Sequence, residues 1–125
     1  MLYALVCYNS EAVINAWTQE KDDAVMADHA VSLQKLAVKR KLGPVARLMP
    51  TTAATTVRSS GRDQLVLDGP FAETKEQLLG FYVIDCESLE EAIETARSFV
   101  VEPGAIEVRP VSFFEPGVGL GVAPK

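Results

Sequence analysis

The sequence contains few of the side chains from which enzyme sites are usually built. Its 125 residues include one histidine, two cysteines and one tryptophan. One histidine and two separated cysteines cannot form a tetrahedral zinc site without carboxylates. A glycine-rich phosphate loop, a nucleophile elbow and paired metal-ligand spacings are also missing. We therefore expect no metal and no cofactor.

Positive charge is scarce as well. Twelve Lys and Arg residues face seventeen Asp and Glu residues, which gives a net charge of −5 and a pI near 4.8. The one local basic cluster, Lys35 with Lys39, Arg40 and Lys41, falls at the end of an expected helix, where cations complement the helix dipole. Nucleic-acid binders usually carry a basic patch, so we expect no nucleic-acid partner.

The N-terminal residues carry no pattern of a secretory signal or a membrane span. The run 2–8 is apolar but short, and no basic segment precedes it. Cys7 and Cys86 lie in or beside apolar runs, where cysteine usually packs as a small hydrophobic residue. We expect a cytoplasmic protein with reduced thiols and no membrane association.

Strand and helix patterns alternate along the chain. Asn9 and Ser10, and then Asp22 or Asp23, are candidate helix N-caps, and Ser88 with Glu91 forms a capping box. The second helix is expected to continue to about Leu42, where Gly43-Pro44 would stop it. Strands are expected at 2–8, 45–49, 51–58, 64–67, 80–86 and 106–111.

This order predicts an α+β fold with one antiparallel sheet, helices on one sheet face and an added β-hairpin. The uncovered sheet face would then need a partner. We expect a single domain over residues 1–114. Residues 115–125 are rich in Gly and Pro without periodicity and predict a flexible tail, although Leu120 and Val122 could instead contact a partner subunit.

An unusual polar loop, Asp68–Gln77, joins two of the expected strands. Gly69 and Pro70 would end the first strand sharply, and charges of both signs then surround Phe71. Thr74 and Gln77 have capping-box spacing, which predicts one helical turn at Thr74. The chemistry of the loop is compatible with a binding site and equally with a solvated corner.

Together with Gly80-Phe81-Tyr82, the run 68–77 resembles the signature of the DGPF group within the YCII-related proteins. The segment 107–110 resembles the closing strand of that group, and the resemblance covers residues 1–111. It implies a ferredoxin-like unit that dimerises face to face into an α/β barrel, and hence a homodimer. It implies little about the reaction.

His29 falls on the apolar face of the long helix, between Leu33 and Leu36. A lone histidine in such a position is often a packed core residue, but an imidazole oriented by a carboxylate can also transfer protons. The family resemblance implies a His–Asp dyad in which His29 is the histidine. The family's acid lies late on the same helix, where this chain has lysine and arginine, so we assign the acid to Asp68 by inference.

The other candidates surround the signature loop, and each has a second interpretation. Gly69 and Pro70 could contact a ligand or only shape the turn. Phe71 could line a pocket or pack into the core. Glu73 and Lys75 could bind a ligand or form salt bridges, and Arg58 could meet an anionic ligand or remain a solvated surface residue.

These candidate residues and the family resemblance are compatible with two functions. The first is binding of an unknown small molecule in a pocket lined by His29 and the Asp68 loop, with acid–base catalysis of the lyase, isomerase or dehydrohalogenase type. The alternative is a non-catalytic regulatory or sensing module, because members of the family occur beside sigma factors.

Overall fold

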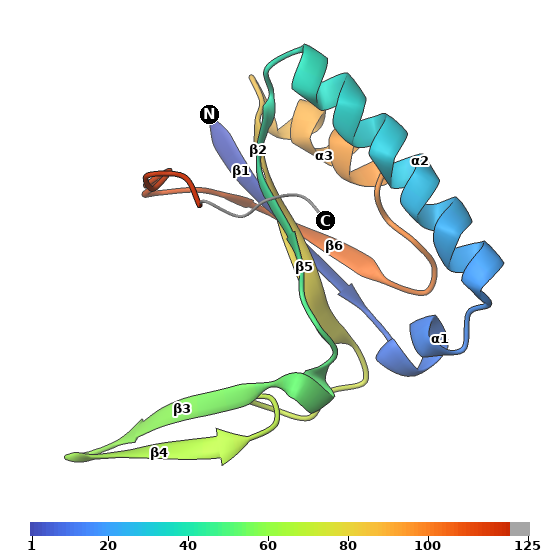
Figure 1. Cartoon of the computed structure of the whole chain (residues 1–125). Coiled ribbons are helices and arrows are strands. Elements are labelled where there is room, and N and C mark those ends of the chain that lie inside the picture. The colour runs from blue at the N-terminus through green and yellow to red at the C-terminus, as the bar shows by residue number, and fades with distance from the viewer. Residues whose placement is uncertain (121–125) are drawn as a thin grey trace.

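The structure is a computed structural model that describes residues 1–120. Residues 121–125, which include part of the expected tail and Val122, lie outside the described residues. The elements follow one another as shown in Figure 1: β1 (Leu2–Asn9), α1 (Glu11–Asn15), α2 (Gln19–Val38), β2 (Leu42–Arg47), the 3-10 turn η1 (Thr51–Ala53), β3 (Thr55–Ser60), β4 (Asp63–Asp68), β5 (Gln77–Asp85), α3 (Leu89–Arg97) and β6 (Ala105–Pro110).

Four strands form the main sheet in the order β2-β5-β1-β6, and every neighbouring pair is antiparallel. Helices α2 and α3 lie on one face of this sheet, and β3 and β4 form a separate hairpin (Figure 1). The expected α+β class, the antiparallel sheet and the helices on one face are confirmed.

The core lies between this sheet and the two longer helices. Tyr3 and Leu5 alternate with outward residues along β1, and Ile84 of β5 pairs opposite Tyr3. Leu5 and Ile84 are fully buried, and Ala92 of α3 packs with them. Burying one such aliphatic side chain contributes about 1.5–3 kcal/mol, so this layer supplies much of the driving force for folding.

The helix starts follow the capping residues. Ser10 caps α1 by accepting from the Val13 N–H, and Ser88 caps α3 by accepting from the Glu91 N–H, both as expected. The start of α2 differs from the prediction, because Thr18 is its N-cap and accepts from the Lys21 N–H.

The expected end of α2 at Leu42 is wrong. The helix ends at Val38, and Arg40 adopts a positive φ of 58°. The Lys41 N–H then donates to the Leu36 carbonyl at 2.9 Å, a bond across six residues that is typical of a Schellman cap. The chain therefore changes direction at Arg40. Gly43-Pro44 does not stop the helix but lies in an irregular part of β2.

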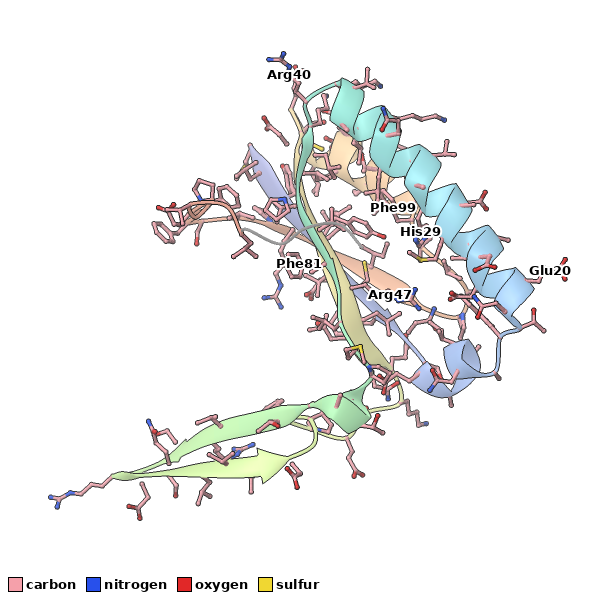
Figure 2. All side chains as sticks on the ribbon, viewed as in Figure 1. Glu20, His29, Arg40, Arg47, Phe81 and Phe99 are labelled. Atoms are coloured by element: carbon pink, nitrogen blue, oxygen red, sulfur yellow. The ribbon has the colours of Figure 1, made fainter. Side chains whose placement is uncertain are left out.

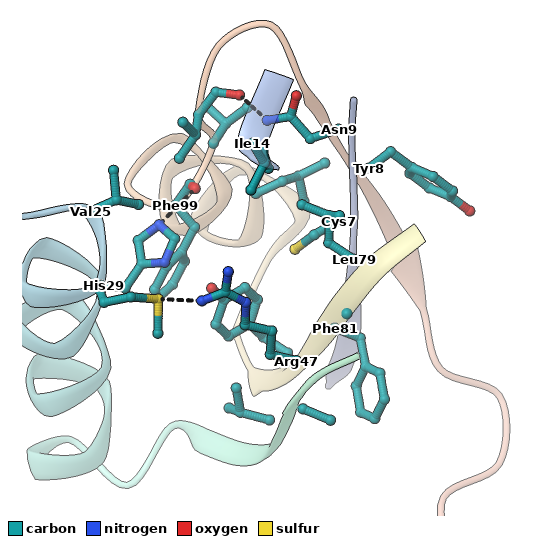
Figure 3. Close-up of a pocket in the computed structure, with 18 of the residues that line it drawn as sticks. Cys7, Tyr8, Asn9, Ile14, Val25, His29, Arg47, Leu79, Phe81 and Phe99 are labelled. Atoms are coloured by element: carbon teal, nitrogen blue, oxygen red, sulfur yellow. Dashed lines mark hydrogen bonds between the residues drawn. The ribbon is translucent and has the colours of Figure 1, made fainter. Parts of the chain in front are cut away.

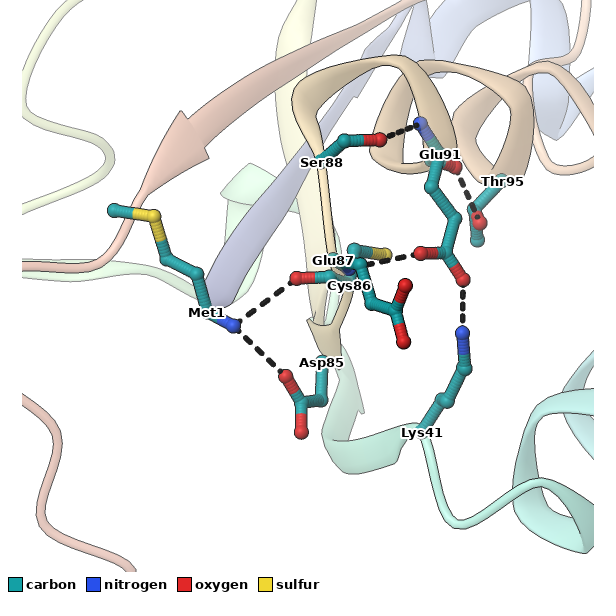
Figure 4. Close-up of polar contacts among 8 residues, drawn as sticks. All are labelled: Met1, Lys41, Asp85, Cys86, Glu87, Ser88, Glu91 and Thr95. Atoms are coloured by element: carbon teal, nitrogen blue, oxygen red, sulfur yellow. Dashed lines mark hydrogen bonds and ion pairs between the residues drawn. The ribbon is translucent and has the colours of Figure 1, made fainter.

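A polar cluster ties together one end of the sheet (Figure 4). The N-terminal amine of Met1 donates to the Asp85 carboxylate at 3.1 Å. Glu91 accepts from the ammonium of Lys41 and from the Glu87 N–H, the latter at 2.8 Å. The Lys41 hydrogen bond is the main cause that lowers the pKa of Glu91, and the same bond raises the pKa of Lys41. The pair joins the start of β2 to α3.

The hairpin of β3 and β4, residues 55–68, extends away from the helix-covered body, and we call it the arm (Figure 1). Its two-residue turn begins with Gly61 at φ 63°, a positive angle that such turns favour. Val57 pairs with Val66, and these side chains are 64% and 69% exposed. An isolated two-stranded hairpin is marginally stable in water, so the arm lacks the support that the main sheet has.

The face of the main sheet opposite to the helices is apolar on β1 and β5 and carries an ion pair on the edge strand β6. Val6 and Phe81 pair there, since they alternate with the core residues of β1 and β5. Figure 2 shows Phe81 on the other side of the sheet from His29 and Phe99. We call this surface the outer face.

Candidate functional site

A cavity of about 150 Å³ lies between α2 and the sheet (Figure 3). Its walls come from residues 22–33 of α2, the ends of β1 and β2, the middle of β5, and the segment after α3. Most of the lining is apolar and includes Val25, Leu33, Leu79 and Phe99. Small concave apolar sites with a few polar groups are typical of ligand-binding sites, and the polar groups therefore decide what this one can do.

His29 extends from α2 into this cavity. Its Nε2 lies 3.2 Å from the Phe99 carbonyl oxygen, and its ring meets the Phe99 ring edge-on at 5.6 Å. Because a carbonyl oxygen only accepts hydrogen bonds, Nε2 carries the hydrogen in this contact. In the neutral ring Nδ1 then has a free lone pair, which is the form of imidazole that can accept a proton.

Tyr82 of β5 stacks on Phe99 beneath the histidine. The ring centroids of Tyr82 and Phe99 are 4.2 Å apart, with an interplanar angle of 24°. Burial raises the pKa of Tyr82 to about 12. The phenol therefore stays protonated at neutral pH and can donate a hydrogen bond to a group in the cavity.

Cys7 also lines the cavity but is not suited to nucleophilic catalysis. Burial raises the pKa of its thiol to about 11, and the sulfur donates weakly to the Leu5 carbonyl at 3.8 Å. A thiol with a raised pKa forms little thiolate at neutral pH. Cys7 therefore acts as apolar lining, and it is not bonded to Cys86.

Asn9 closes one end of the cavity. The residue is 3% exposed, and its amide donates to the Val101 carbonyl at 2.9 Å while its oxygen accepts from the Ser10 N–H at 2.8 Å. These bonds connect the end of β1 to the segment that follows α3. Asn9 is thus a structural residue whose polar groups are already satisfied.

Arg47 brings a permanent positive charge to the cavity. It stands at the end of β2, and its guanidinium donates to the Met26 sulfur at 3.2 Å and to the Asp22 carboxylate at 3.4 Å. Arg47 is not among the site residues predicted from the sequence. A signal was present, because Arg47 is a single charged residue in the apolar run 45–49.

The structure does not bring His29 and Asp68 together within one chain. Asp68 is the last residue of β4 on the arm, and its side chain is exposed. It is not among the described residues that line the cavity, and His29 makes its hydrogen bond to Phe99. Within the described chain, the predicted acid and the predicted base therefore occupy two separate regions.

The neighbouring signature residues shape the base of the arm. Gly69 has a φ of 98°, donates its N–H to the Ala54 carbonyl at 2.8 Å, and accepts from the Thr56 hydroxyl at 2.8 Å. Pro70 follows it with an exposed side chain. These contacts favour the turn-forming interpretation of Gly69 and Pro70.

Arg58 and Phe71 lie against each other outside the cavity. The guanidinium carbon of Arg58 is 5.4 Å from the centre of the Phe71 ring, a ring that belongs to a 75% exposed residue. Glu73 and Lys75 are exposed too, and neither takes part in a salt bridge with another described residue. These four predicted ligand-binding residues contribute nothing to the cavity wall within residues 1–120.

The predicted helical turn at Thr74 is wrong. The Thr74 hydroxyl donates to the Glu76 carbonyl, and the Gln77 amide donates to the Thr74 carbonyl at 2.6 Å. Gln77 is also the first residue of β5, and its side-chain oxygen accepts from the Glu11 N–H at 2.8 Å. The polar side chains at the end of the loop are thus used to join it to α1.

Residues 1–120 contain neither a metal-binding cluster nor a membrane-spanning helix. No group of three or more His, Cys, Asp or Glu side chains in residues 1–120 is arranged to hold a metal ion. No helix in the same range is long and apolar enough to cross a membrane.

The sequence is similar to a known family and to a bacterial protein over nearly its whole length. The family model for the YCII-related domain matches residues 1–115. A protein of Rhizobium meliloti (strain 1021), named Uncharacterized protein R00369, is 54% identical over 120 residues, which cover 94% of this chain and 97% of that protein.

Proposed function

The chain belongs to the YCII-related family, and we propose that it binds a small, largely apolar molecule in the cavity between α2 and the sheet. In this proposal His29 transfers a proton to or from the bound molecule. The observation that carries the proposal is the position of His29, a half-buried imidazole that is fixed through Nε2 on the wall of an apolar cavity.

Proton transfer at this site needs few partners. The Nδ1 lone pair takes a proton from a C–H or O–H group, and the electron pair of that bond stays on the ligand. The imidazolium then returns the proton to another atom, which is an isomerisation, or the electron pair expels a leaving group, which is an elimination. The Tyr82 phenol could donate a hydrogen bond to the atom on which negative charge develops.

A homodimer is part of the proposal. The antiparallel order β2-β5-β1-β6 supports a ferredoxin-like unit of the DGPF group, and the apolar outer face supports pairing of two such units into a barrel. For Asp68 to orient His29, the carboxylate has to come from the arm of a second subunit. The two free cysteines support a cytoplasmic, reducing setting.

The exposed apolar side chains of the arm also support the regulatory alternative, in which the arm contacts another protein. The two functions separate experimentally, because one depends on the cavity and the other on the arm. Filling the cavity would abolish ligand binding while leaving the arm unchanged.

Benzene is a suitable first probe, because a dry apolar cavity of about 150 Å³ accommodates it. In a titration followed by NMR, we expect benzene to shift the His29 ring signals of the wild-type chain. Leu33→Phe should fill the cavity and remove the shift, whereas Leu65→Phe on the arm should leave it unchanged. Absence of any benzene effect on His29 would contradict the proposed binding site.

Catalysis is tested on whichever substrate a screen identifies. General acid–base catalysis contributes about 10²–10⁴-fold to a rate. His29→Gln should therefore lower kcat by about 100-fold or more, while Arg97→Gln on the exposed side of α3 should change it little. A His29→Gln protein with the wild-type kcat would refute the catalytic part and leave a binding protein.

A further inference from the structure

We infer that the ligand of this cavity is a small monocarboxylate, whose carboxylate binds Arg47 and whose apolar part fills the space beside His29. The inference rests on the proposed function and adds the chemical class of the ligand to it. It comes from the unused donor capacity of the one arginine on the cavity wall.

The Arg47 guanidinium is poorly satisfied by its partners. A guanidinium has five N–H donors, and two described contacts are made here, to the Met26 sulfur at 3.2 Å and to the Asp22 oxygen at 3.4 Å. A thioether is a weak acceptor, and charge-assisted N–H···O bonds are normally about 2.7–2.9 Å long. A ligand carboxylate could replace the sulfur and form shorter bonds than either present partner.

The position of Arg47 also favours an anionic ligand. Among the described lining residues, Arg47 is the one with a permanent positive charge, and most of the others are apolar. Its side chain is 57% exposed, so the charged group of a ligand would stay near water while the remainder enters the cavity. Figure 3 shows His29 and Arg47 extending into the same cavity, one from α2 and the other from β2.

The size and charge of the site limit the chemical class of the ligand further. About 150 Å³ accommodates a body the size of a benzene ring. The Asp22 carboxylate beside Arg47 would repel a second negative charge, and a phosphate group carries nearly two at neutral pH. One guanidinium next to one carboxylate therefore suits a monoanion better than a phosphate ester.

The test compares probes that share a ring and differ in charge. Benzene, benzyl alcohol, benzoate and phenyl phosphate are titrated into the wild-type chain at pH 7.5 and low salt. Binding is followed by the fluorescence of Trp17, the single tryptophan of the chain, which lines the cavity. We expect benzoate to bind at least tenfold more tightly than benzyl alcohol, and more tightly than phenyl phosphate.

Three variants show whether the preference comes from Arg47. Arg47→Gln should reduce benzoate affinity to that of benzyl alcohol without changing benzene affinity. Asp22→Asn should raise benzoate affinity several-fold, because it removes the competing carboxylate. Arg97→Gln makes the same charge change on the exposed side of α3 and should have no effect.

The outcomes separate this inference from the proposed function. If benzene and benzyl alcohol bind but benzoate binds no better, or if Arg47→Gln keeps the preference, the carboxylate inference is refuted and the cavity remains a binding site. If phenyl phosphate binds most tightly, the site is a phosphate site and the inference is also wrong. If none of the probes binds, both the proposed function and the inference fail.

Discussion

The helix-covered body and the arm use similar strand residues but differ in what supports them. In the body, Leu5 and Ile84 are fully buried between the sheet and the helices. In the arm, Val57 and Val66 form a cross-strand pair that is mostly exposed. A second layer of structure therefore decides whether an apolar strand produces a core and a cavity or an exposed surface.

The candidate functional residues divide in the same way. His29 and Arg47 lie on the cavity wall of the body, whereas Arg58 and Asp68 lie on the arm. The cavity is assembled from segments that are far apart in the sequence, and the signature loop is one continuous run. The signature loop therefore lies outside the cavity wall, whereas the second part of the signature, residues 80–82, lines it.

The largest expected effect is a difference in core stability. Ile84→Ala removes a fully buried side chain and should lower the free energy of unfolding by about 2–5 kcal/mol. Val66→Ala on the arm should change it by about 0.5 kcal/mol or less at low protein concentration. Urea denaturation measures both. Equal losses for the two variants would show that the arm is packed in solution.

An added methyl group should also have different effects at Gly80 in the body and at Gly69 at the base of the arm. A Cβ at Gly80 would lie 2.1 Å from the Ala46 carbonyl oxygen, so Gly80→Ala should cost stability at the upper end of about 1–3 kcal/mol and weaken ligand binding. A Cβ at Gly69 would meet no atom within 4 Å, and only its φ of 98° would be strained, at about 1–2 kcal/mol. Thermal denaturation and the benzoate titration would show whether Gly69→Ala leaves binding intact.

The Lys41–Glu91 pair should make the stability of the body depend on pH. Because the pKa of Glu91 is lowered in the folded state, its stabilising effect is complete above the ordinary value of 4.5 and is lost as the pH falls below it. The free energy of unfolding should be larger for the wild type than for Glu91→Gln at pH 7, and the difference between the two should decrease toward pH 3. Urea titrations at several pH values test this. Glu94→Gln is the control, and a gap that is the same at every pH would contradict the assignment.

The smallest effect is expected at Arg58. Its contact with the exposed Phe71 ring is a surface interaction, worth about 0.5–1 kcal/mol. Arg58→Gln should therefore change unfolding by about that amount and leave the benzoate affinity unchanged. A loss of benzoate binding in this variant would show that Arg58 contributes to the ligand site.

Local patterns in the sequence predicted most of the elements. The caps at Ser10 and Ser88, the hairpin and the helices on one sheet face follow from short-range chemistry, and the structure confirms them. The end of α2 could not be predicted in this way. The reversal depends on Arg40 entering the left-handed region, which is uncommon for a residue other than glycine.

The candidate site was predicted only in part. His29 was found because it is the single histidine and lies on an apolar helix face. Arg47 was missed because its role depends on the approach of β2 to Asp22 and Met26, residues more than twenty positions earlier in the chain. Pairing of His29 with Asp68 within one chain would need an arm that folds back onto the helix, and the hairpin instead extends outward (Figure 1). Pairing across a dimer stays a prediction.

An NMR titration shows directly whether the ligand binds in the cavity or at the arm and the signature loop. Benzoate is titrated into the 15N-labelled chain, and the shifts of the backbone amide signals are mapped onto the structure. We expect the large shifts to cluster at Leu33, Arg47, Tyr82 and Phe99 and the amides of residues 55–68 to stay unchanged. Large shifts confined to the arm and to residues 69–76 would contradict this expectation.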